Sequence, residues 1–309
     1  MPLGIGTGLL QAAWHMAADH PLHPPAPGWR PFAKMQALGN DFIIVPALHE
    51  PFTPTPDLIR HLADRRGGIG CDQLLVLDPS PTDQADFCCR IFNADGSASG
   101  QCGNGLRCLA ALVFAMGWHQ GEVIRFLVAG RQILCHGDAA TVAVNMGPAS
   151  FEVRSVGFNT PPPMGWPHLD IDGHTAVALS LGNPHLVVFV ADIHDATIET
   201  MASTLARDTR FAQGVNVGFC HVEHEDLLQL RVFERGVGET PACGSGATAA
   251  CLAWWSQGAD PLGRKRCRIR MPGGLLEVRQ DQEGLWLLGP TELVFWGAFP
   301  PWPPVPSNP

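Results

Sequence analysis

Short runs of apolar and β-branched residues, bounded by glycine, proline and aspartate, recur along the whole chain. Ten of these runs predict strands: residues 42–45, 74–77, 87–92, 123–128, 141–146, 186–190, 215–222, 228–234, 268–271 and 285–288. Four segments predict helices: residues 58–65, 105–115, 198–207 and 246–255. The pattern indicates an α+β protein that is mostly strand.

Two of the predicted helices are apolar on nearly every side. They run from Leu106 to Phe114 and from Ala247 to Trp254. A helix that is apolar all round must be enclosed by protein. We therefore expect each helix to lie inside a strongly curved sheet that is rolled around it.

Each of these helices follows a cysteine and a Gly-x-Gly, and the two surroundings match. The first copy reads FNADGSASGQCGNGLRC from Phe92, and the second reads FERGVGETPACGSGATAAC from Phe233. Cys102 and Cys243 are 141 residues apart (243 − 102), as are the two phenylalanines (233 − 92). This period is too long for a solenoid and predicts two homologous domains.

The expected domain boundaries follow from this repeat. Residues 34–146 with 289–301 form an N-terminal domain that carries Cys102, and residues 147–288 form a C-terminal domain that carries Cys243. Residues 1–33 form an extension of unknown role.

Composition excludes several classes of protein. The net charge of −9 argues against nucleic-acid binding, and no apolar stretch approaches the length of a membrane span. No Lys or Arg precedes the apolar segment near the N-terminus, which argues against a secretory signal. The ten cysteines include no C-x-x-C pair, so we expect no metal site, reduced thiols and a cytoplasmic location.

The start of each buried helix favours an anion. The glycines leave free backbone N–H groups at the positive end of the helix dipole. Such a terminus lowers the pKa of a thiol and can also hold a substrate carboxylate over Gly103-Asn104 and Gly244-Ser245. Two thiols on opposite faces of one carbon could remove a proton and return one. The simpler alternative is a pair of buried cysteines at tight turns.

No cofactor is indicated. The chain has neither a dinucleotide-binding G-x-G-x-x-G between a strand and a helix nor a Walker sequence. Its two lysines, Lys34 and Lys265, are not near a glycine-rich phosphate loop, which argues against pyridoxal phosphate.

Together these residues closely resemble the diaminopimelate epimerase family, which interconverts LL- and meso-diaminopimelate without pyridoxal phosphate. The resemblance rests on the two cysteine motifs with MQALGNDF (35–42), GGIGCDQ (67–73), LGNPH (181–185) and GVNV (214–217). It implies two pseudo-symmetric domains, each a mixed barrel-like sheet around one helix, with the active site in the cleft between them. It also implies an isomerase of lysine and peptidoglycan-precursor biosynthesis.

The resemblance also assigns roles to individual residues. Cys102 and Cys243 are the catalytic thiolate and thiol, and His185 and Glu234 tune their pKa values. The substrate-binding positions are Asn40, Gln73, Asn93, Gly103, Asn104, Asn183, Asn216, Glu234, Arg235, Gly244 and Ser245. These residue types suit a substrate that is zwitterionic at both ends. Arg235 can bind a carboxylate with two hydrogen bonds, while Glu234 suits an ammonium group. A homodimer is possible, although Phe295 stands where the family has a tyrosine.

Three alternatives remain open at this stage. A proline or hydroxyproline racemase of the same superfamily would not need residues for a second charged end of the substrate. A non-catalytic amino-acid-binding protein would not require both cysteines. A redox protein would use Cys102 and Cys243 as a switchable disulfide.

Overall fold

The structure is a computed structural model that describes residues 27–100, 102–159, 164–258 and 265–302. The chain divides into two compact units. Unit 1 is Met1–Val144 with Gly289–Pro309, and unit 2 is Asn145–Leu288. The sequence had assigned residues 145 and 146 to the first domain. Residues 1–26, most of the expected extension, lie outside the described part of the chain.

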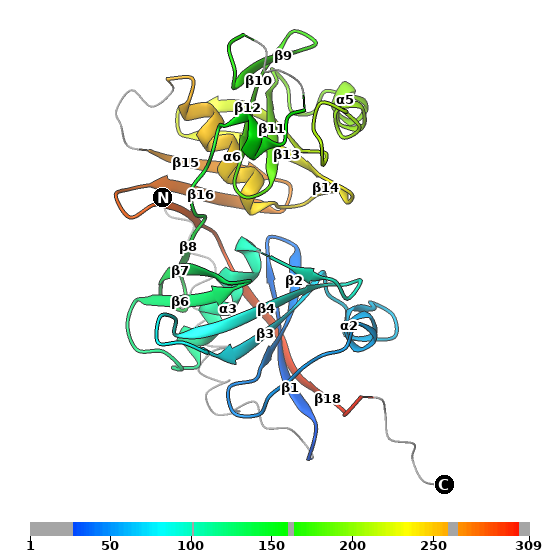
Figure 1. Cartoon of the computed structure of the whole chain (residues 1–309), viewed down its shortest axis with the longest axis vertical. Coiled ribbons are helices and arrows are strands. Elements are labelled where there is room, and N and C mark those ends of the chain that lie inside the picture. The colour runs from blue at the N-terminus through cyan, green and yellow to red at the C-terminus, as the bar shows by residue number, and fades with distance from the viewer. Residues whose placement is uncertain (1–26, 101, 160–163, 259–264, 303–309) are drawn as a thin grey trace. The chain divides into compact units, whose positions relative to one another are not determined.

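In its described residues, unit 1 is a curved mixed sheet (Figure 1) that carries helices α2 and α3. Its strands are β1 (Arg30–Ala37), β2 (Asn40–Pro46), β3 (Gln73–Pro79), β4 (Phe87–Asn93), β5 (Ala98–Ser99), β6 (Val123–Val128), β7 (Arg131–Gly137), β8 (Val142–Asn145, across the unit boundary) and β18 (Glu292–Phe299). The order is β18-β1-β2-β3-β4-β6-β7-β8, with β5 alongside β4. β2–β3 and β4–β6 are parallel pairs, and the other pairs are antiparallel.

Helices α2 and α3 cover opposite faces of this sheet. Helix α3 (Gly103–Ala115) contacts β1, β2, β3 and β7, and its residues from Asn104 to Val113 are buried. Helix α2 (Pro56–Ala63), capped by Thr55, packs its apolar residues against the outward-facing side chains of β2 and β3. Side chains alternate along a strand, so Phe42 faces α3 while Ile43 faces α2.

Unit 2 repeats this plan strand for strand. Its strands are β9 (His168–Ile171), β10 (His174–Ser180), β11 (Pro184–Phe189), β12 (Asn216–His224), β13 (Leu227–Glu234), β14 (Gly238–Thr240), β15 (Arg266–Met271), β16 (Gly274–Gln280) and β17 (Leu285–Leu288). The order is β9-β10-β11-β12-β13-β15-β16-β17, with β11–β12 and β13–β15 parallel and β14 alongside β13. Helix α6 (Gly244–Trp255) contacts β10 to β13, β15 and β16, while α4 (Val153–Val156) and α5 (Thr197–Leu205) cover the other face.

The predicted fold class is confirmed, with two repeated units that each hold an enclosed helix. All four predicted helices and all ten predicted strands have counterparts. The sequence missed β1, β7, β9, β10, β16 and β18, together with the short β5, β14 and α4. Residues 30–33, expected in the extension, belong to β1 and pair with β18, so that expectation was wrong for these residues.

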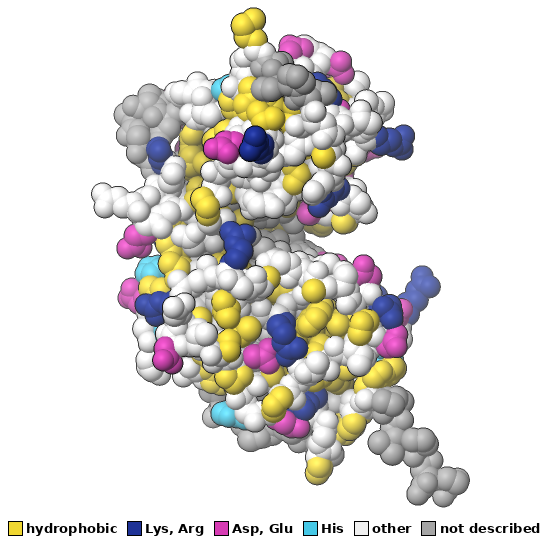
Figure 2. Space-filling model, viewed as in Figure 1, with side chains coloured by type: hydrophobic (Ala, Val, Ile, Leu, Met, Phe, Trp, Pro, Cys, Tyr) yellow, Lys and Arg dark blue, Asp and Glu magenta, His cyan; other side chains and the backbone are white. Residues whose placement is uncertain are grey.

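Charged side chains form local pairs at the surface. The exposed arginines of β15 lie on one face of the strand and pair with Glu277, Asp226 and Glu223. Figure 2 shows basic and acidic side chains interspersed on the face that it presents. Among the described residues, no helix is both long enough and apolar enough to span a bilayer.

Candidate active site

Each motif cysteine is the N-cap of the enclosed helix of its unit. The Cys102 sulfur accepts the N–H of Gly105 at 3.3 Å, and the Cys243 sulfur accepts the N–H of Gly246 at 3.4 Å. Both cysteines have extended backbone conformations, as N-caps do. The predicted placement of the two thiols at the amino ends of buried helices is thus present in the structure.

The glycine three residues after each cysteine lets the helix approach the sheet. A Cβ at Gly246 would lie 2.8 Å from Val232 Cγ2, and one at Gly105 would lie 3.1 Å from Leu75 Cδ2 and 3.2 Å from Phe42 Cε1. A larger residue would force the start of the helix away from the strands and change the position of the sulfur.

In unit 1 the predicted polar residues gather at one end of the sheet. Asn40 begins β2 and Gln73 begins β3, which is parallel to β2. Asn93 ends β4 and pairs in register with Gln73 across an antiparallel ladder. Gln73 Nε2 donates to Asn93 Oδ1 at 2.9 Å. Its Oε1 is buried and accepts no hydrogen bond from any residue that the structure describes.

Two side-chain amides connect Cys102 to the interior of unit 1. Asn40 Oδ1 accepts a hydrogen bond from Asn104 Nδ2 at 3.3 Å and lies 4.0 Å from the Cys102 sulfur. Asn104 Oδ1 in turn accepts from Arg107 Nη2 at 3.0 Å. The orientation of both amides is therefore set by their neighbours.

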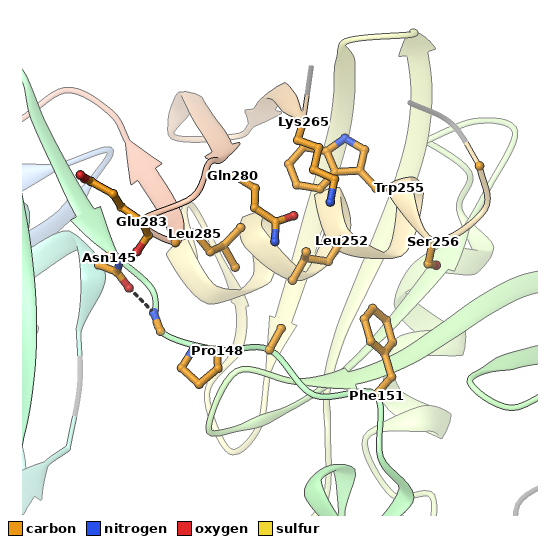
Figure 3. A pocket seen from close by; sticks show the side chains of 14 residues that line it. Asn145, Pro148, Phe151, Leu252, Trp255, Ser256, Lys265, Gln280, Glu283 and Leu285 are labelled. Atoms are coloured by element: carbon orange, nitrogen blue, oxygen red, sulfur yellow. Dashed lines mark hydrogen bonds between the residues drawn. The ribbon is translucent and has the colours of Figure 1, made fainter. Parts of the chain in front are cut away.

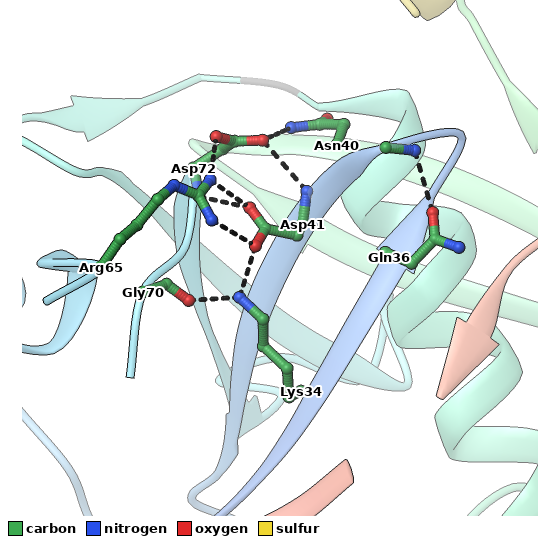
Figure 4. Close-up of polar contacts among 8 residues, drawn as sticks. Lys34, Gln36, Asn40, Asp41, Arg65, Gly70 and Asp72 are labelled. Carbon is green, nitrogen blue, oxygen red and sulfur yellow. Dashed lines mark hydrogen bonds and ion pairs between the residues drawn. The ribbon is translucent and has the colours of Figure 1, made fainter. Parts of the chain in front are cut away.

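A cluster of charged residues holds Asn40 from its other side (Figure 4). Asn40 Nδ2 donates to Asp72 Oδ2 at 2.8 Å, and Arg65 bridges Asp72 to Asp41 with contacts of 2.8 Å. The buried Lys34 donates to Asp41 at 2.6 Å. Burial alone would raise the pKa of Asp41, but the bonds and charges of Arg65 and Lys34 hold it well below its ordinary value.

In unit 2 the first polar group surrounds Cys243 and the start of α6. The Cys243 sulfur lies 3.5 Å from Ser245 Oγ, which also receives a hydrogen bond from Asn183 Nδ2 at 3.5 Å. Asn183 Oδ1 is 3.1 Å from His185 Nε2. Burial lowers the pKa of His185 to about 3, so this imidazole is neutral at physiological pH. It therefore fixes the Asn183 amide by hydrogen bonding rather than by charge.

The second polar group of unit 2 lies at the ends of β12 and β13. Asn216 Oδ1 accepts the backbone N–H of Arg235 at 3.0 Å, and its Nδ2 donates to the Pro184 carbonyl at 3.1 Å. Glu234 Oε1 accepts the Thr240 hydroxyl at 2.7 Å. Arg235 is exposed and donates one Nη1 bond to a backbone carbonyl, leaving the rest of its guanidinium accessible.

The pKa of Cys243 does not follow the expectation from the sequence. A helix N-terminus lowers the pKa of a thiol, but burial and then the charge of Glu234 raise the pKa of Cys243 to about 12. The bonds from Ser245 and Gly246 oppose these effects without outweighing them. Cys243 is therefore a neutral thiol at physiological pH.

A separate cavity of about 670 Å³ lies at the far end of α6 (Figure 3). Leu252 and Trp255 of that helix line it together with Phe151, Lys265 and Gln280. None of the site residues predicted from the sequence is among the described residues that line it. The chemistry of the cysteine motifs therefore does not belong to this cavity. In the described part of the chain, no group of three or more His, Cys, Asp or Glu is placed to hold a metal ion.

The structure thus gathers each predicted set of residues within its own unit. The sequence did not point to Asp72, Asp41 or Arg107 as parts of the site. All three lie inside quoted motifs: Asp41 in MQALGNDF, Asp72 in GGIGCDQ and Arg107 in QCGNGLRC. Their position in a motif was therefore a signal, but their hydrogen-bond partners could not be read from the sequence.

Comparisons with known proteins agree with this organisation. A model of the diaminopimelate epimerase family matches residues 32–152 and 177–294. A diaminopimelate epimerase of Alkalilimnicola ehrlichii is 40% identical over 282 residues, which cover 87% of this chain and 98% of that protein.

Solved structures share the fold at low sequence identity. A probable proline racemase from Agrobacterium radiobacter K84 has a TM-score of 0.61 at 15% identity, covering 89% of this chain and 94% of the other. A protein of the phenazine biosynthesis PhzF family from Enterococcus faecalis has a TM-score of 0.60 at 14% identity, covering 88% and 99%. Such distant likenesses establish the fold alone.

Proposed function

The chain belongs to the diaminopimelate epimerase family of isomerases, and from this premise we propose that it interconverts LL-2,6-diaminopimelate and meso-diaminopimelate. The observation that carries the proposal is the doubled arrangement of Cys102 and Cys243. Each sulfur accepts a backbone N–H at the amino end of an enclosed helix. The expected place of the reaction is lysine and peptidoglycan-precursor biosynthesis in the cytoplasm, and the enzyme could act as a homodimer.

The reaction needs one base and one acid. The thiolate of one cysteine takes the α-proton, and the electron pair of the broken C–H bond delocalises into the neighbouring carboxylate. The thiol of the other cysteine then gives its proton to the opposite face of the carbon. After one turnover the two sulfurs have exchanged protonation states, so the same pair serves the reverse direction. No cofactor enters this scheme.

The charge that develops on the substrate carboxylate is matched by the helix starts. α3 begins at Gly103 and α6 begins at Gly244. The first N–H groups of a helix point out of its amino end, because the first turn has no internal acceptors for them. With Asn104 and Ser245 they form the proposed carboxylate cradle. N–H groups fixed before the reaction stabilise an enolate-like intermediate without reorganising.

Several polar residues have no part in proton transfer, and we propose that they bind the non-reacting end of the substrate. The accessible guanidinium of Arg235 can bind a carboxylate with two hydrogen bonds. Asn183 and Asn216 offer amide groups, and Glu234 is the carboxylate suited to an ammonium group. A ring-shaped imino acid such as proline has no second charged end to bind these residues, which makes a proline-type racemase the weaker candidate.

The direct test is to incubate the purified protein with LL-diaminopimelate and follow meso product by chiral chromatography. Reaction in D₂O is expected to place deuterium on the α-carbon of the product. Parallel reactions with L-proline and trans-4-hydroxy-L-proline test the alternative. Conversion of an imino acid without conversion of diaminopimelate would overturn the proposed substrate, and unlabelled product would overturn the proton-transfer mechanism.

A further inference from the structure

Arg107 is a buried cation on the enclosed helix of unit 1, five residues after Cys102, and the two interact electrostatically. It lies in α3 with no exposed surface, in the next turn of the helix after Cys102. One of its nitrogens donates to Asn104 Oδ1 at 3.0 Å. Its Nε and Nη1 have no hydrogen-bond partner among the residues that the structure describes. Because a guanidinium has five N–H donors and keeps its charge in proteins, this one is mostly unsatisfied.

A buried cation is costly unless an anion compensates it. The electrostatic partners of Arg107 within the described residues are three cysteines and no carboxylate. Two of them, Cys108 and Cys135, are wholly buried, and burial raises the pKa of each far above neutrality. Only Cys102 retains partial exposure. It is therefore the one partner able to ionise and supply the missing negative charge.

The other ionisable groups around α3 do not compete for this role. Lys34 on β1 and Arg65 are paired with Asp41 on β2, and Arg65 also binds Asp72. Cys89 on β4 also interacts with Cys102, and burial raises the pKa of Cys89 well above the ordinary value. His119 contacts Phe114, at the opposite end of α3 from Cys102.

We propose that Arg107 is a positioning residue whose buried charge holds Cys102 as a thiolate in the resting enzyme. The inference rests on the proposed function, and it assigns the resting base to unit 1. Arg107 acts without touching the reacting carbon. Its charge favours the ionised sulfur, and its hydrogen bond fixes the Asn104 amide that forms part of the carboxylate cradle.

The two amides between Arg107 and Asp72 form a polarised chain. Arg107 binds the oxygen of Asn104, the Asn104 nitrogen binds the oxygen of Asn40, and the Asn40 nitrogen binds Asp72. A cation at one end and a carboxylate at the other fix both amides in one orientation. Hydrogen bonds in such chains strengthen one another in a low-dielectric interior. The Cys102 sulfur therefore lies beside two amide side chains, Asn40 and Asn104, whose orientations are fixed.

Unit 2 provides the internal contrast. Thr248 holds the position in α6 that Arg107 holds in α3, five residues after its cysteine, and its hydroxyl donates to the Gly244 carbonyl at 2.8 Å. No cation replaces Arg107 there, and Glu234 adds negative charge that raises the pKa of Cys243. The resting pair is thus a thiolate at Cys102 and a thiol at Cys243.

The test measures the ionisation of each thiol separately and without substrate. The protein is alkylated with iodoacetamide across a range of pH, and modification of the Cys102 and Cys243 peptides is quantified by mass spectrometry. In the wild type we expect the midpoint for Cys102 to lie below that of a free cysteine, about 8.5. We expect Cys243 to react only at much higher pH.

Three variants separate charge from structure. Arg107→Gln keeps a donor for Asn104 but removes the charge, and it should raise the Cys102 midpoint by about one pH unit or more. Arg107→Lys keeps the charge and should retain most of the low midpoint. Thr248→Val, the matched change in α6, should leave both midpoints unchanged. Circular dichroism confirms that each variant is folded.

Two results would overturn the inference. One is a wild-type Cys102 that titrates like a free cysteine or higher, a result that needs no variant to fold. The other is a folded Arg107→Gln protein with the wild-type midpoint. Turnover of LL-diaminopimelate with an ordinary Cys102 midpoint would reject only this inference. A low midpoint without turnover of diaminopimelate would reject only the proposed function.

Discussion

The enclosed helices of the two units share a scaffold and differ in charge. Both begin at a cysteine whose sulfur accepts an N–H three residues on, and both are surrounded by strands in the same order. Cys102 interacts with the buried cation of Arg107, whereas Cys243 interacts with the carboxylate of Glu234. The repeat therefore preserves geometry while the polar residues around it diverge.

This difference suits the proposed reaction, which needs one base and one acid. A symmetric pair would hold two thiols or two thiolates, and neither state has both a base and an acid. Under the proposal, opposite charges near the two sulfurs favour one ionised and one neutral cysteine before the substrate binds. A duplicated fold supplies matched positions, and a few substitutions, such as Asn93 in unit 1 against Glu234 in unit 2, supply the polarity.

Removing either sulfur is expected to have the largest effect. Cys102→Ala and Cys243→Ala should each lower kcat/KM for epimerisation by about 10²–10⁴-fold, the usual contribution of a proton carrier. The buried cysteine later in each helix provides the control, and Cys108→Ala and Cys251→Ala should change the rate only a few-fold. Chiral chromatography of the product measures both sets. Full turnover by one of the motif variants would rule out a two-base mechanism.

The next largest effect is expected on stability, from breaking the cluster of ion pairs around Asp41 in unit 1. Asp41→Ala leaves Lys34 buried without its carboxylate and should lower the free energy of unfolding by about 3–5 kcal/mol. The control is Asp226→Ala, which breaks an exposed pair with Arg268 in unit 2 and should cost less than about 1 kcal/mol. Urea denaturation measures both. Equal losses in the two variants would contradict the structural importance of the cluster.

The same cluster makes a prediction for acid stability. Because the folded-state pKa of Asp41 is depressed, its contribution is complete above the unfolded-state value of about 3.9 and is lost as the pH falls through the folded value. The difference in stability between wild type and Asp41→Ala should therefore shrink in acid. A difference that stays constant into strong acid would count against ionisation of Asp41 as its source.

These contrasts show what the sequence could and could not predict. The enclosed helices were predictable because a helix that is apolar on all sides has no stable exposed arrangement, and the cysteine motifs marked where they begin. β1 was missed because it pairs with β18, which is far away in the sequence, and because its residues include Lys34 and Gln36. An isolated run of this composition has no clear strand pattern.

The electrostatics of the site were less predictable than its residues. The helix dipole predicted low pKa values for both thiols, but burial and Glu234 reverse the expectation for Cys243. Arg107 is one arginine in an otherwise apolar helix, a position where the side chain could equally have reached the surface. Whether a charged residue is paired depends on neighbours that are distant in sequence, such as Cys135 on β7.

An effect of intermediate size is expected where each enclosed helix approaches its sheet closely, at Gly246 in unit 2 and at Gly105 in unit 1. Gly246→Ala would bring a Cβ against the β-branched Val232, which cannot rotate away, and should lower the stability by about 1–3 kcal/mol. Gly105→Ala meets the flexible end of Leu75 at a longer distance and should cost less. Thermal unfolding of the two variants measures the difference. A larger loss in Gly105→Ala would show that α3, rather than α6, is the more tightly held helix.

The smallest effect is expected from the Glu234→Gln variant. It removes the negative charge that distinguishes the surroundings of Cys243 in unit 2. Glu234 raises the pKa of Cys243, so Glu234→Gln should lower that pKa and increase the thiolate fraction at a fixed alkaline pH. A decrease of one pH unit corresponds to about a tenfold faster alkylation of Cys243 below its midpoint. The control is Glu239→Gln, which alters a carboxylate paired with Arg231 on the neighbouring strand. If both variants leave the alkylation of Cys243 unchanged, burial alone accounts for its neutral state. The contrast between the units would then depend on Arg107.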